Sequence, residues 1–467
     1  MIVKQMRKYY NETMLKIIRT GALILGVSYF FSALLGLIRD RLLASRFGAG
    51  PELDVYFAAF RIPDFVYGIL IMGGLSAVFL PVLAEYFRKS DQEGWQLVNV
   101  VLNSFLVLLI VFCGILAILT PWLIELVAPG FTQAQKELAV PLTRLMFLSP
   151  ILFGLSSIFS GVLHYFNRFL AFSTAPILYN LGIILGIIFF VPAFGVMGLA
   201  FGVILGAFSH LAIQIPSAAT SGFRYSFTVN FEYPGLLKIF KFMAWRALGA
   251  SVYHINLIVV TAIASTLTLG SITVLNFSSN ISQFATAIIG VSFATAAFPT
   301  LSRAFANGGR EEFLKNFSST FKHILFWAVP SSVVIFLFRN QIVKTILGAG
   351  LFGALEMKLT SAALGLFCFG IFAFALIPLL LRAFFALHDV KTPTIIGLTY
   401  MVLTVASSFF FVWLLGFANA FQRFLAQALN LQNIGNIQVI GLPLAVSLSG
   451  IIYFSLLLLF LRKKLQL

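Results

Sequence analysis

Charged residues are scarce in this chain. Only 10% of its 467 residues are Asp, Glu, Lys or Arg, whereas about a quarter are charged in an average soluble domain. Hydrophobic residues make up 60% of the chain. So little charge excludes a soluble domain, and so much apolar surface excludes a disordered chain. The composition is that of a polytopic membrane protein whose surroundings are mostly lipid.

Cysteine is almost absent, and histidine is dispersed. Cys113 and Cys368 lie far apart in apolar runs, so they form neither a disulfide framework nor a thiolate metal site. The five histidines do not cluster, and no HExxH, Walker-type or GxSxG sequence occurs. We therefore expect a protein that is not an enzyme, with no catalytic residue, no metal site and no cofactor.

Acidic residues are also few, 15 against 31 Lys and Arg, which gives a net charge of +16. In a soluble protein this excess would suggest nucleic acid. Here no soluble stretch is long enough to form a binding domain, so we expect no nucleic-acid partner. Basic residues instead gather in cytoplasmic loops beside anionic membrane lipids.

Long apolar runs are abundant. A spanning helix needs about 20 mostly apolar residues. Polar, Gly and Pro breaks separate twelve such runs, and a basic, somewhat amphipathic lead-in precedes them. The predicted spans are 21–47, 55–87, 97–127, 138–165, 170–193, 196–220, 239–268, 272–304, 317–348, 358–387, 393–416 and 439–461.

The basic residues orient these spans. With the N-terminus inside, 19 Lys and Arg fall in cytoplasmic segments or span ends, seven in outer ones and five within spans. Cytoplasmic loops carry the excess of Lys and Arg in membrane proteins. Both termini are therefore predicted to be cytoplasmic.

The chain also repeats itself. Residues 76–87 (SAVFLPVLAEYF) and 294–305 (ATAAFPTLSRAF) share Pro, Leu and Phe at an offset of 218. Both segments end a span on the cytoplasmic side, so the repeat is parallel. This predicts an all-α polytopic membrane protein with about 12 transmembrane helices, in two six-helix lobes around a central cavity. The predicted parts are a cytoplasmic or interfacial lead-in (1–20), an N-lobe (21–221), an inter-lobe linker (222–238) and a C-lobe (239–467).

Charges inside spans are costly, roughly 2.5–3.5 kcal/mol each on insertion scales, so they mark candidate functional residues. Arg39 lies near the middle of the first span and shares a helix face with Ser32 and Gly36. Its guanidinium could grip phosphate oxygens, or it could form a structural ion pair. We interpret the neighbouring Asp40 chiefly as a structural counter-ion.

The second hairpin helix carries three more candidates. Asp54 could be a helix N-cap or an outer-gate charge. Arg61 lies two turns further on and could bind a lipid phosphate. Alternatively, it pairs with Asp64, three residues later.

In the seventh span, Arg246 could reach the cytoplasmic surface or face the cavity. His254 and Asn256 follow it in the same span. We interpret both as hydrogen-bonding groups in helix packing rather than as ligands.

Residues 36–65 (GLIRDRLLASRFGAGPELDVYFAAFRIPDF) and 75–87 (LSAVFLPVLAEYF) are similar to the first hairpin of the MurJ/MviN family of lipid II flippases. Residues 161–186 (GVLHYFNRFLAFSTAPILYNLGIILG) resemble its fourth and fifth spans, and 382–393 (RAFFALHDVKTP) the end of its tenth. The resemblance covers nearly the whole chain in order.

The resemblance implies a cavity open alternately to either side, and arginines that grip the pyrophosphate of a lipid-linked peptidoglycan precursor. The family's RD pair falls on Arg39 and Asp40. Its outer-loop Asp falls on Asp54, and the basic residue before its LPN or IPN falls on Arg61.

Other family positions differ here. Where the family has SR early in the first span, this chain has Ser32 followed by Ala33. Two family arginine positions fall on Tyr67 and near Asn280, and an acidic position falls on Met72. We hypothesise that Arg246 compensates from another helix. The family commonly has two further spans, thirteen and fourteen, beyond the twelve predicted here.

We therefore expect a lipid II flippase of the bacterial cytoplasmic membrane, acting by alternating access as a monomer. Its expected partners are an undecaprenyl-pyrophosphate-linked substrate, membrane lipids and cell-wall synthesis proteins. The alternatives are a flippase for another polyprenyl-linked glycan, a MATE-like drug exporter, and a non-transporting membrane scaffold or regulator. The expected substrate-binding residues are Ser32, Arg39, Arg61, Tyr67, Arg246 and Asn280, and the expected gate or ion-pair residues are Asp40, Asp54 and Asp64.

Overall fold

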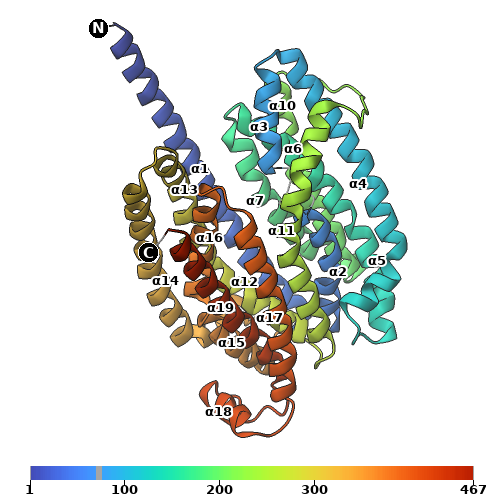
Figure 1. Cartoon of the computed structure of the whole chain (residues 1–467). Coiled ribbons are helices and arrows are strands. Elements are labelled where there is room, and N and C mark those ends of the chain that lie inside the picture. Colours follow the sequence, from blue (N-terminus) through green and yellow to red (C-terminus); the bar gives the residue numbers. More distant parts are fainter. Residues whose placement is uncertain (1, 70–75, 466–467) are drawn as a thin grey trace. The chain divides into compact units, whose positions relative to one another are not determined.

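The computed structural model describes the backbone of residues 2–69 and 76–465, and the side chains of 24–69, 78–243, 247 and 251–465. Within these ranges the chain is helical, with no strand (Figure 1). In chain order the helices are α1 (Ile2–Phe47), α2 (Pro51–Tyr67), α3 (Ser76–Phe87), α4 (Asp91–Val127), α5 (Gln133–Met146), α6 (Leu148–Tyr165), α7 (Phe169–Leu185), η2 (Gly186–Phe190), α8 (Val191–Phe194), α9 (Met197–Ala212), α10 (Ile215–Thr220), α11 (Pro234–Ser265), α12 (Ser271–Thr286), η3 (Ala287–Val291), α13 (Ser292–Ala306), α14 (Arg310–Leu347), α15 (Ala354–Cys368), α16 (Ile371–Ala386), α17 (Lys391–Leu414), α18 (Ala420–Ala428), η4 (Gln438–Ile440) and α19 (Gly441–Lys464).

The predicted spans coincide with helix for most of their described length. Among the described residues, eight helical segments are long and apolar enough to cross a membrane. A ninth is added if α15 and α16, which meet at a bend of 48°, form one broken span. The all-α polytopic membrane fold is therefore confirmed. From Ile2 onward, the predicted lead-in, 1–20, and the first span lie on one helix, α1.

The longest exposed apolar stripe of α4 shows why these helices need lipid. Val111, Ile115, Ile118, Trp122 and Leu126 follow one another at steps of three or four residues, so they share one helix face, and all are half or more exposed. A soluble protein seldom leaves so large an apolar patch in water. This face of α4 is therefore suited to contact acyl chains.

The helices divide into two compact units. Each has its own core of fully buried side chains, including Phe79 and Val101 in the first and Leu376 and Phe384 in the second. Unit 1 comprises Met1–Arg39, Pro63–Thr120 and Leu142–Ser251, and unit 2 comprises Asp40–Ile62, Pro121–Pro141 and Val252–Leu467.

Glycines let two helices of unit 1 come unusually close. A Cβ atom built on Gly182 of α7 would lie 2.3 Å from the Cα atom of Gly206 on α9, and one built on Gly186 would lie 2.4 Å from the Cα atom of Gly202. Membrane helices lack a hydrophobic force that drives them together in lipid, so small residues and close backbone packing supply the attraction. These glycines therefore hold α7 against α9.

We expect Gly182→Val to destabilise the protein by about 1–3 kcal/mol or more, because the added methyl groups must push two backbones apart. Thermal unfolding of the purified protein measures the effect. The control is Gly114→Val on α4, where a Cβ atom meets nothing within 4 Å. Equal melting temperatures for the two variants would contradict the close packing of α7 on α9.

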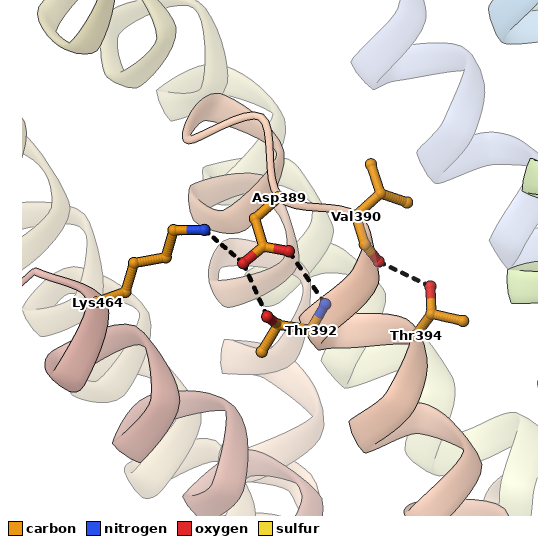
Figure 2. Close-up of polar contacts among 5 residues, drawn as sticks. All are labelled: Asp389, Val390, Thr392, Thr394 and Lys464. Atoms are coloured by element: carbon orange, nitrogen blue, oxygen red, sulfur yellow. Dashed lines mark hydrogen bonds and ion pairs between the residues drawn. The ribbon is translucent and has the colours of Figure 1, made fainter.

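A polar cluster in unit 2 fixes the start of α17. The Asp389 carboxylate accepts hydrogen bonds from the backbone N–H of Thr392 at 3.0 Å and from its hydroxyl at 2.8 Å, and it pairs with Lys464 at the end of α19 (Figure 2). A carboxylate at a helix N-terminus satisfies otherwise unpaired N–H groups. These contacts thus hold the turn at 387–390 against the start of α17 and the end of α19.

This cluster makes stability depend on pH. Burial raises the pKa of Asp389, but the hydrogen bonds from Lys464 and Thr392 outweigh burial and hold it below its ordinary value. The carboxylate therefore stabilises the fold fully above the ordinary pKa, about 4, and this contribution is lost as the pH falls through the lowered pKa. Asp389→Asn should lower stability by about 1 kcal/mol at neutral pH and lack this loss in acid. Melting temperatures measured from about pH 7 down to about pH 3 test both statements. Identical pH profiles for the two proteins would contradict them.

The same backbone irregularity precedes both repeated segments, 76–87 and 294–305. Residues 68–69, after α2, have π-helical geometry, and so does η3, which begins 219 residues after Gly68. Each is followed by an α-helix with an internal proline, Pro81 in α3 and Pro299 in α13. These two π-helical turns recur at nearly the offset of the sequence repeat, as a duplication would produce. A third, η2, has no counterpart at that offset.

Candidate functional site

Arg39 is held by a neutral amide in unit 1. Its Nη1 atom donates to Oδ1 of Asn180 on α7 at 3.2 Å. The amide nitrogen of Asn180 donates in turn to the hydroxyl and the backbone carbonyl of Ser32, two turns earlier on α1, both at 3.2 Å. Asn180 is 8% exposed, while Arg39 and Ser32 are half-buried. The amide therefore helps to orient the guanidinium.

Asp40, the next residue, is hydrogen-bonded to a residue of α12 within unit 2. Nδ2 of Asn280 donates to Oδ2 of Asp40 at 2.8 Å, and Asp40 is only 2% exposed. Asn280 occupies one of the two positions where the resemblance implies an arginine. Here the position supplies a neutral hydrogen-bond donor to a buried carboxylate.

Asp54 binds the start of another helix. Its Oδ2 atom accepts from the backbone N–H of Gly270 at 2.7 Å, and Oδ1 accepts from the N–H and hydroxyl of Thr273 at 2.8 and 2.7 Å. Since α2 begins at Pro51, Asp54 lies in the first turn of its own helix and not at its N-cap. The carboxylate instead stabilises the N-terminus of α12, where the helix dipole favours negative charge.

The geometry at this position requires a glycine. Gly270 has φ of +85°, and a Cβ atom there would lie 2.2 Å from the backbone oxygen of Ala49. Asp54 is 3% exposed in this closely packed place. The loop after α1 and the start of α12 are thus joined through both backbone packing and carboxylate hydrogen bonds.

Arg61 is anchored by two helices of unit 2. Its Nε atom donates to the hydroxyl of Thr261 on α11 at 2.7 Å, and Nη2 donates to Oδ1 of Asn276 on α12 at 2.8 Å. Both partners are themselves fixed, since Thr261 donates to Leu257 and Asn276 to Ile272 in their own helices. The residue is 9% exposed, so a cation is fixed well inside the apolar unit.

Arg61 also lines a cavity of about 390 Å³ that lies wholly within unit 2. The cavity wall combines polar side chains with aromatic rings, on α2, α11, α12, η3, α15, α16, α17 and α19. Its lining residues are Arg61, Tyr253, Asn256, Leu257, Val260, Thr261, Leu275, Asn276, Ser279, Ser282, Gln283, Thr286, Val291, Phe367, Phe374, Pro378, Tyr400 and Val446.

Of the remaining candidates, Tyr67 and Asp64 lie among the described residues. Tyr67 is half-buried in the last turn of α2, where its ring centroid lies 5.0 Å from that of Phe153 in unit 1. Asp64 is half-buried one turn earlier. The side chain of Arg246 and residue Met72 lie outside the described residues.

Sequence reasoning did not single out the amides and hydroxyl that hold these charges. Asn180, Thr261 and Asn276 each bind a candidate arginine from a helix more than 100 residues away. Asn180 lies in the segment that resembles the family's fifth span, and a polar residue in an apolar run was the available signal.

The sequence of this chain is similar to that of known membrane proteins. The family model described as "Lipid II flippase MurJ" matches residues 43–467. The "Probable lipid II flippase MurJ" of Buchnera aphidicola subsp. Schizaphis graminum is 31% identical over 393 residues, which are 81% of this chain and 75% of that protein. The "Lipid II flippase MurJ" of Burkholderia cenocepacia is 29% identical over 409 residues, 85% of this chain and 79% of that one.

Solved structures show the same fold. A structure of "Lipid II flippase MurJ, inward closed conformation" has a TM-score of 0.78 at 24% identity, covering 94% of this chain and 87% of that one. An inward-facing multidrug resistance MATE family transporter of the MOP superfamily has a TM-score of 0.72 at 17% identity, covering 93% and 94%. With the family model spanning most of its length, this multi-pass membrane chain belongs to the MurJ lipid II flippase family.

Proposed function

We propose that the chain moves lipid II from the inner to the outer leaflet of the bacterial cytoplasmic membrane. Membership of the lipid II flippase family over residues 43–467 is the observation that carries this proposal. Residues 21–221 and 239–467 would act as the two lobes of an alternating-access transporter, joined by the linker 222–238. The reaction is translocation without covalent chemistry.

The cation that we assign to the pyrophosphate is Arg39. Its hydrogen bond to Asn180 helps to aim the guanidinium. A fork of N–H donors matches phosphate oxygens better than a point charge does. Asp40 and Asp54 would then hold the surrounding helices through Asn280 and the start of α12.

The other candidates take lesser roles in this proposal. Arg61, Arg246, Ser32, Tyr67 and Asn280 would line the path of the headgroup, and Asp64 would be a gate or ion-pair residue. The excess of Lys and Arg on one side supports cytoplasmic termini. The proposal also includes a monomeric chain that binds cell-wall synthesis proteins.

A second candidate is a flippase for a different polyprenyl-linked glycan. Tyr67 and Asn280 favour it, because the resemblance implies arginines at both positions and fewer cations would suit a less anionic headgroup. Asn280 carries no charge, and its amide nitrogen donates a hydrogen bond to Asp40. A MATE-like exporter of lipophilic cations is the remaining transport alternative.

Complementation tests the proposal directly. A bacterium depleted of its own lipid II flippase would receive the wild-type chain, with membrane insertion checked by immunoblot. We expect restored growth and cell shape. A well-inserted chain that fails in two unrelated hosts would argue against lipid II, and accelerated efflux of a lipophilic cation would favour the exporter.

A further inference from the structure

The connection between α17 and η4, residues 415–437, differs from a loop that water surrounds. Arg423 is the only charged residue between Lys391 and Arg462, whereas about a quarter of the residues are charged in an average soluble domain. The connection contains the short helix α18, which lies beyond the end of α17 (Figure 1). The whole segment belongs to unit 2. So little charge suits surroundings that are less polar than water.

One side of α18 is fixed on the core of unit 2. Phe421, Leu425 and Leu429 follow one another at steps of four residues, so they share one helix face. Leu425 and Leu429 are each 7% exposed, and both belong to a buried cluster against which Phe421 also packs. This side of α18 is therefore covered by the protein.

Asn419 fixes the corner between α17 and α18. As the N-cap of α18, its Oδ1 atom accepts from the backbone N–H of Gln422 at 2.8 Å. Its Nδ2 atom donates to the backbone oxygens of Leu414 at 2.6 Å and Phe417 at 3.0 Å. The last carbonyls of one helix and the first N–H groups of the next lack partners within their own helices. A single side chain thus joins the end of α17 to the start of α18.

The opposite side of α18 is exposed. Ala420, Arg423, Phe424, Gln427 and Ala428 lie at the spacings of one helix face, and all of them are exposed. Phe424 is the large apolar side chain on this face, and it is 64% exposed. Water solvates such a ring poorly, so Phe424 needs a contact that unit 2 does not supply.

Exposed aromatic rings continue from the lipid-facing end of α17 into this segment. The ring centroid of Trp413 lies 6.2 Å from that of Phe410 and 5.0 Å from that of Phe417, and all three side chains are exposed. Single exposed apolar residues are common on proteins, but a continuous apolar patch marks a contact surface. The surface that α17 presents to lipid therefore extends to Phe417, just before α18.

The length of α17 places this aromatic row at the edge of the lipid. With 24 residues, α17 is about 36 Å long, somewhat more than the roughly 30 Å of the hydrocarbon layer. Trp413 lies in its last turn, which therefore reaches the headgroup level, where tryptophan is enriched in membrane proteins. Since Phe417 and α18 follow directly, they begin at that level.

Arg423 supplies a positive charge beside Phe424. Its side chain is exposed, and its Nε atom donates to the backbone oxygen of Asn419 at 3.4 Å, which keeps the guanidinium near the start of α18. Helices that lie in the membrane interface combine apolar side chains among the lipids with cations that attract lipid phosphates. The absence of any carboxylate between Lys391 and Arg462 leaves nothing in this connection that would repel a phosphate.

We propose that α18 lies in the headgroup layer of the membrane, with the rings of Phe417 and Phe424 among the ends of the acyl chains and Arg423 at a phospholipid phosphate. The partner of this surface is the lipid itself and not a protein segment. Because α18 is fixed to the core of unit 2, its lipid contacts hold this end of unit 2 at one depth. The inference is independent of the cargo, and with the cytoplasmic termini proposed above the leaflet is the outer one.

A spin label at position 424 tests the inference. Phe424→Cys is labelled with a nitroxide in the purified full-length chain, which is then reconstituted in liposomes of phosphatidylethanolamine and phosphatidylglycerol. Oxygen concentrates in lipid and a neutral nickel chelate in water, so the ratio of the label's collision rates with the two reports its depth. We expect a ratio severalfold higher than that of a label in water.

Reference labels come from unit 2 itself. Phe409→Cys, exposed on α17, gives the value for lipid, and Glu311→Cys, exposed in the first turn of α14, gives the value for water. Cys113 and Cys368 are buried, so the wild-type chain treated with the label measures the background. Phe417→Cys repeats the test without altering α18, and its label should also resemble the one at 409.

The role of Arg423 has its own test. Phosphatidylglycerol should raise the ratio at position 424 above its value in phosphatidylcholine alone, because the anionic surface attracts the guanidinium. Arg423→Gln should remove this increase. The matched control is Lys358→Gln, which removes another exposed cation of unit 2, on α15, and should keep the increase.

Ratios at 417 and 424 equal to that at 311, in chains whose melting temperature is unchanged, would overturn the inference. They would place this side of α18 in water, where a soluble partner could bind it. An increase with phosphatidylglycerol that survives Arg423→Gln would remove the phosphate contact. Neither result depends on whether the chain restores growth in a flippase-depleted bacterium, so the proposed function is tested separately.

Discussion

Arg39→Ala is expected to abolish growth rescue in a bacterium depleted of its own lipid II flippase. The guanidinium is aimed by Asn180, and its removal takes away the donor that we assign to the pyrophosphate. Hydrogen bonds to charged groups are worth about 1.5–3 kcal/mol each, so without two such bonds to the pyrophosphate translocation should slow by more than about a hundredfold. Colony formation under depletion, with protein amounts matched by immunoblot, measures the effect.

Two further variants define what Arg39 contributes. Arg39→Lys keeps the charge but loses the fork of donors, so we expect slow growth rather than none. Arg46→Ala is the control, since Arg46 is exposed in the last turn of the same helix. Full rescue by Arg39→Ala at wild-type protein levels would remove Arg39 from the proposed site.

Asp54→Ala should cause the largest loss of stability. It would leave the N–H groups of Gly270 and Thr273, and the Thr273 hydroxyl, without their acceptor in a place that is 3% exposed. Each unpaired buried group costs about 1–3 kcal/mol, so the sum is several kcal/mol, a large part of the stability of most proteins. Thermal unfolding in detergent and the amount of protein in membranes both report it.

The control for this variant lies two residues away. Glu52 is exposed in the first turn of α2, so Glu52→Ala should leave the melting temperature nearly unchanged. The melting temperature of Asp54→Asn should lie between those of Asp54→Ala and Glu52→Ala. Asparagine keeps one oxygen acceptor, but its amide N–H groups would face the backbone N–H groups of α12. Equal melting temperatures for Asp54→Ala and Glu52→Ala would show that α12 does not need this carboxylate.

Hydropathy predicted the helices better than it predicted their ends. Long apolar runs identify spans because lipid requires every backbone polar group to be paired within a helix. Hydropathy did not indicate where α1 starts, since a basic amphipathic stretch can continue a helix beyond the lipid. The sequence left the role of Asp54 open between a helix N-cap and an outer-gate charge, because its N–H partners lie more than 200 residues away.

The charged candidates were found from their cost in lipid, but their partners were not. Whether Asn180 meets Arg39 depends on how α7 is rotated about its axis, and each residue turns a helix by about 100°. A single sequence gives the apolar face of a helix only coarsely. The amides that hold Arg39 and Arg61 therefore became evident only with the packed helices.

The π-helical turns at 68–69 and in η3 have a consequence for the history of the chain. Each holds one more residue per turn than an α-helix does, so removing one residue would rotate the rest of that span by about 100°. Leu301 would then leave the side of α13 on which it is now buried. A gene duplication that copied an already widened turn explains both turns with a single ancestral insertion, and neither copy could afterwards lose it without repacking its own bundle.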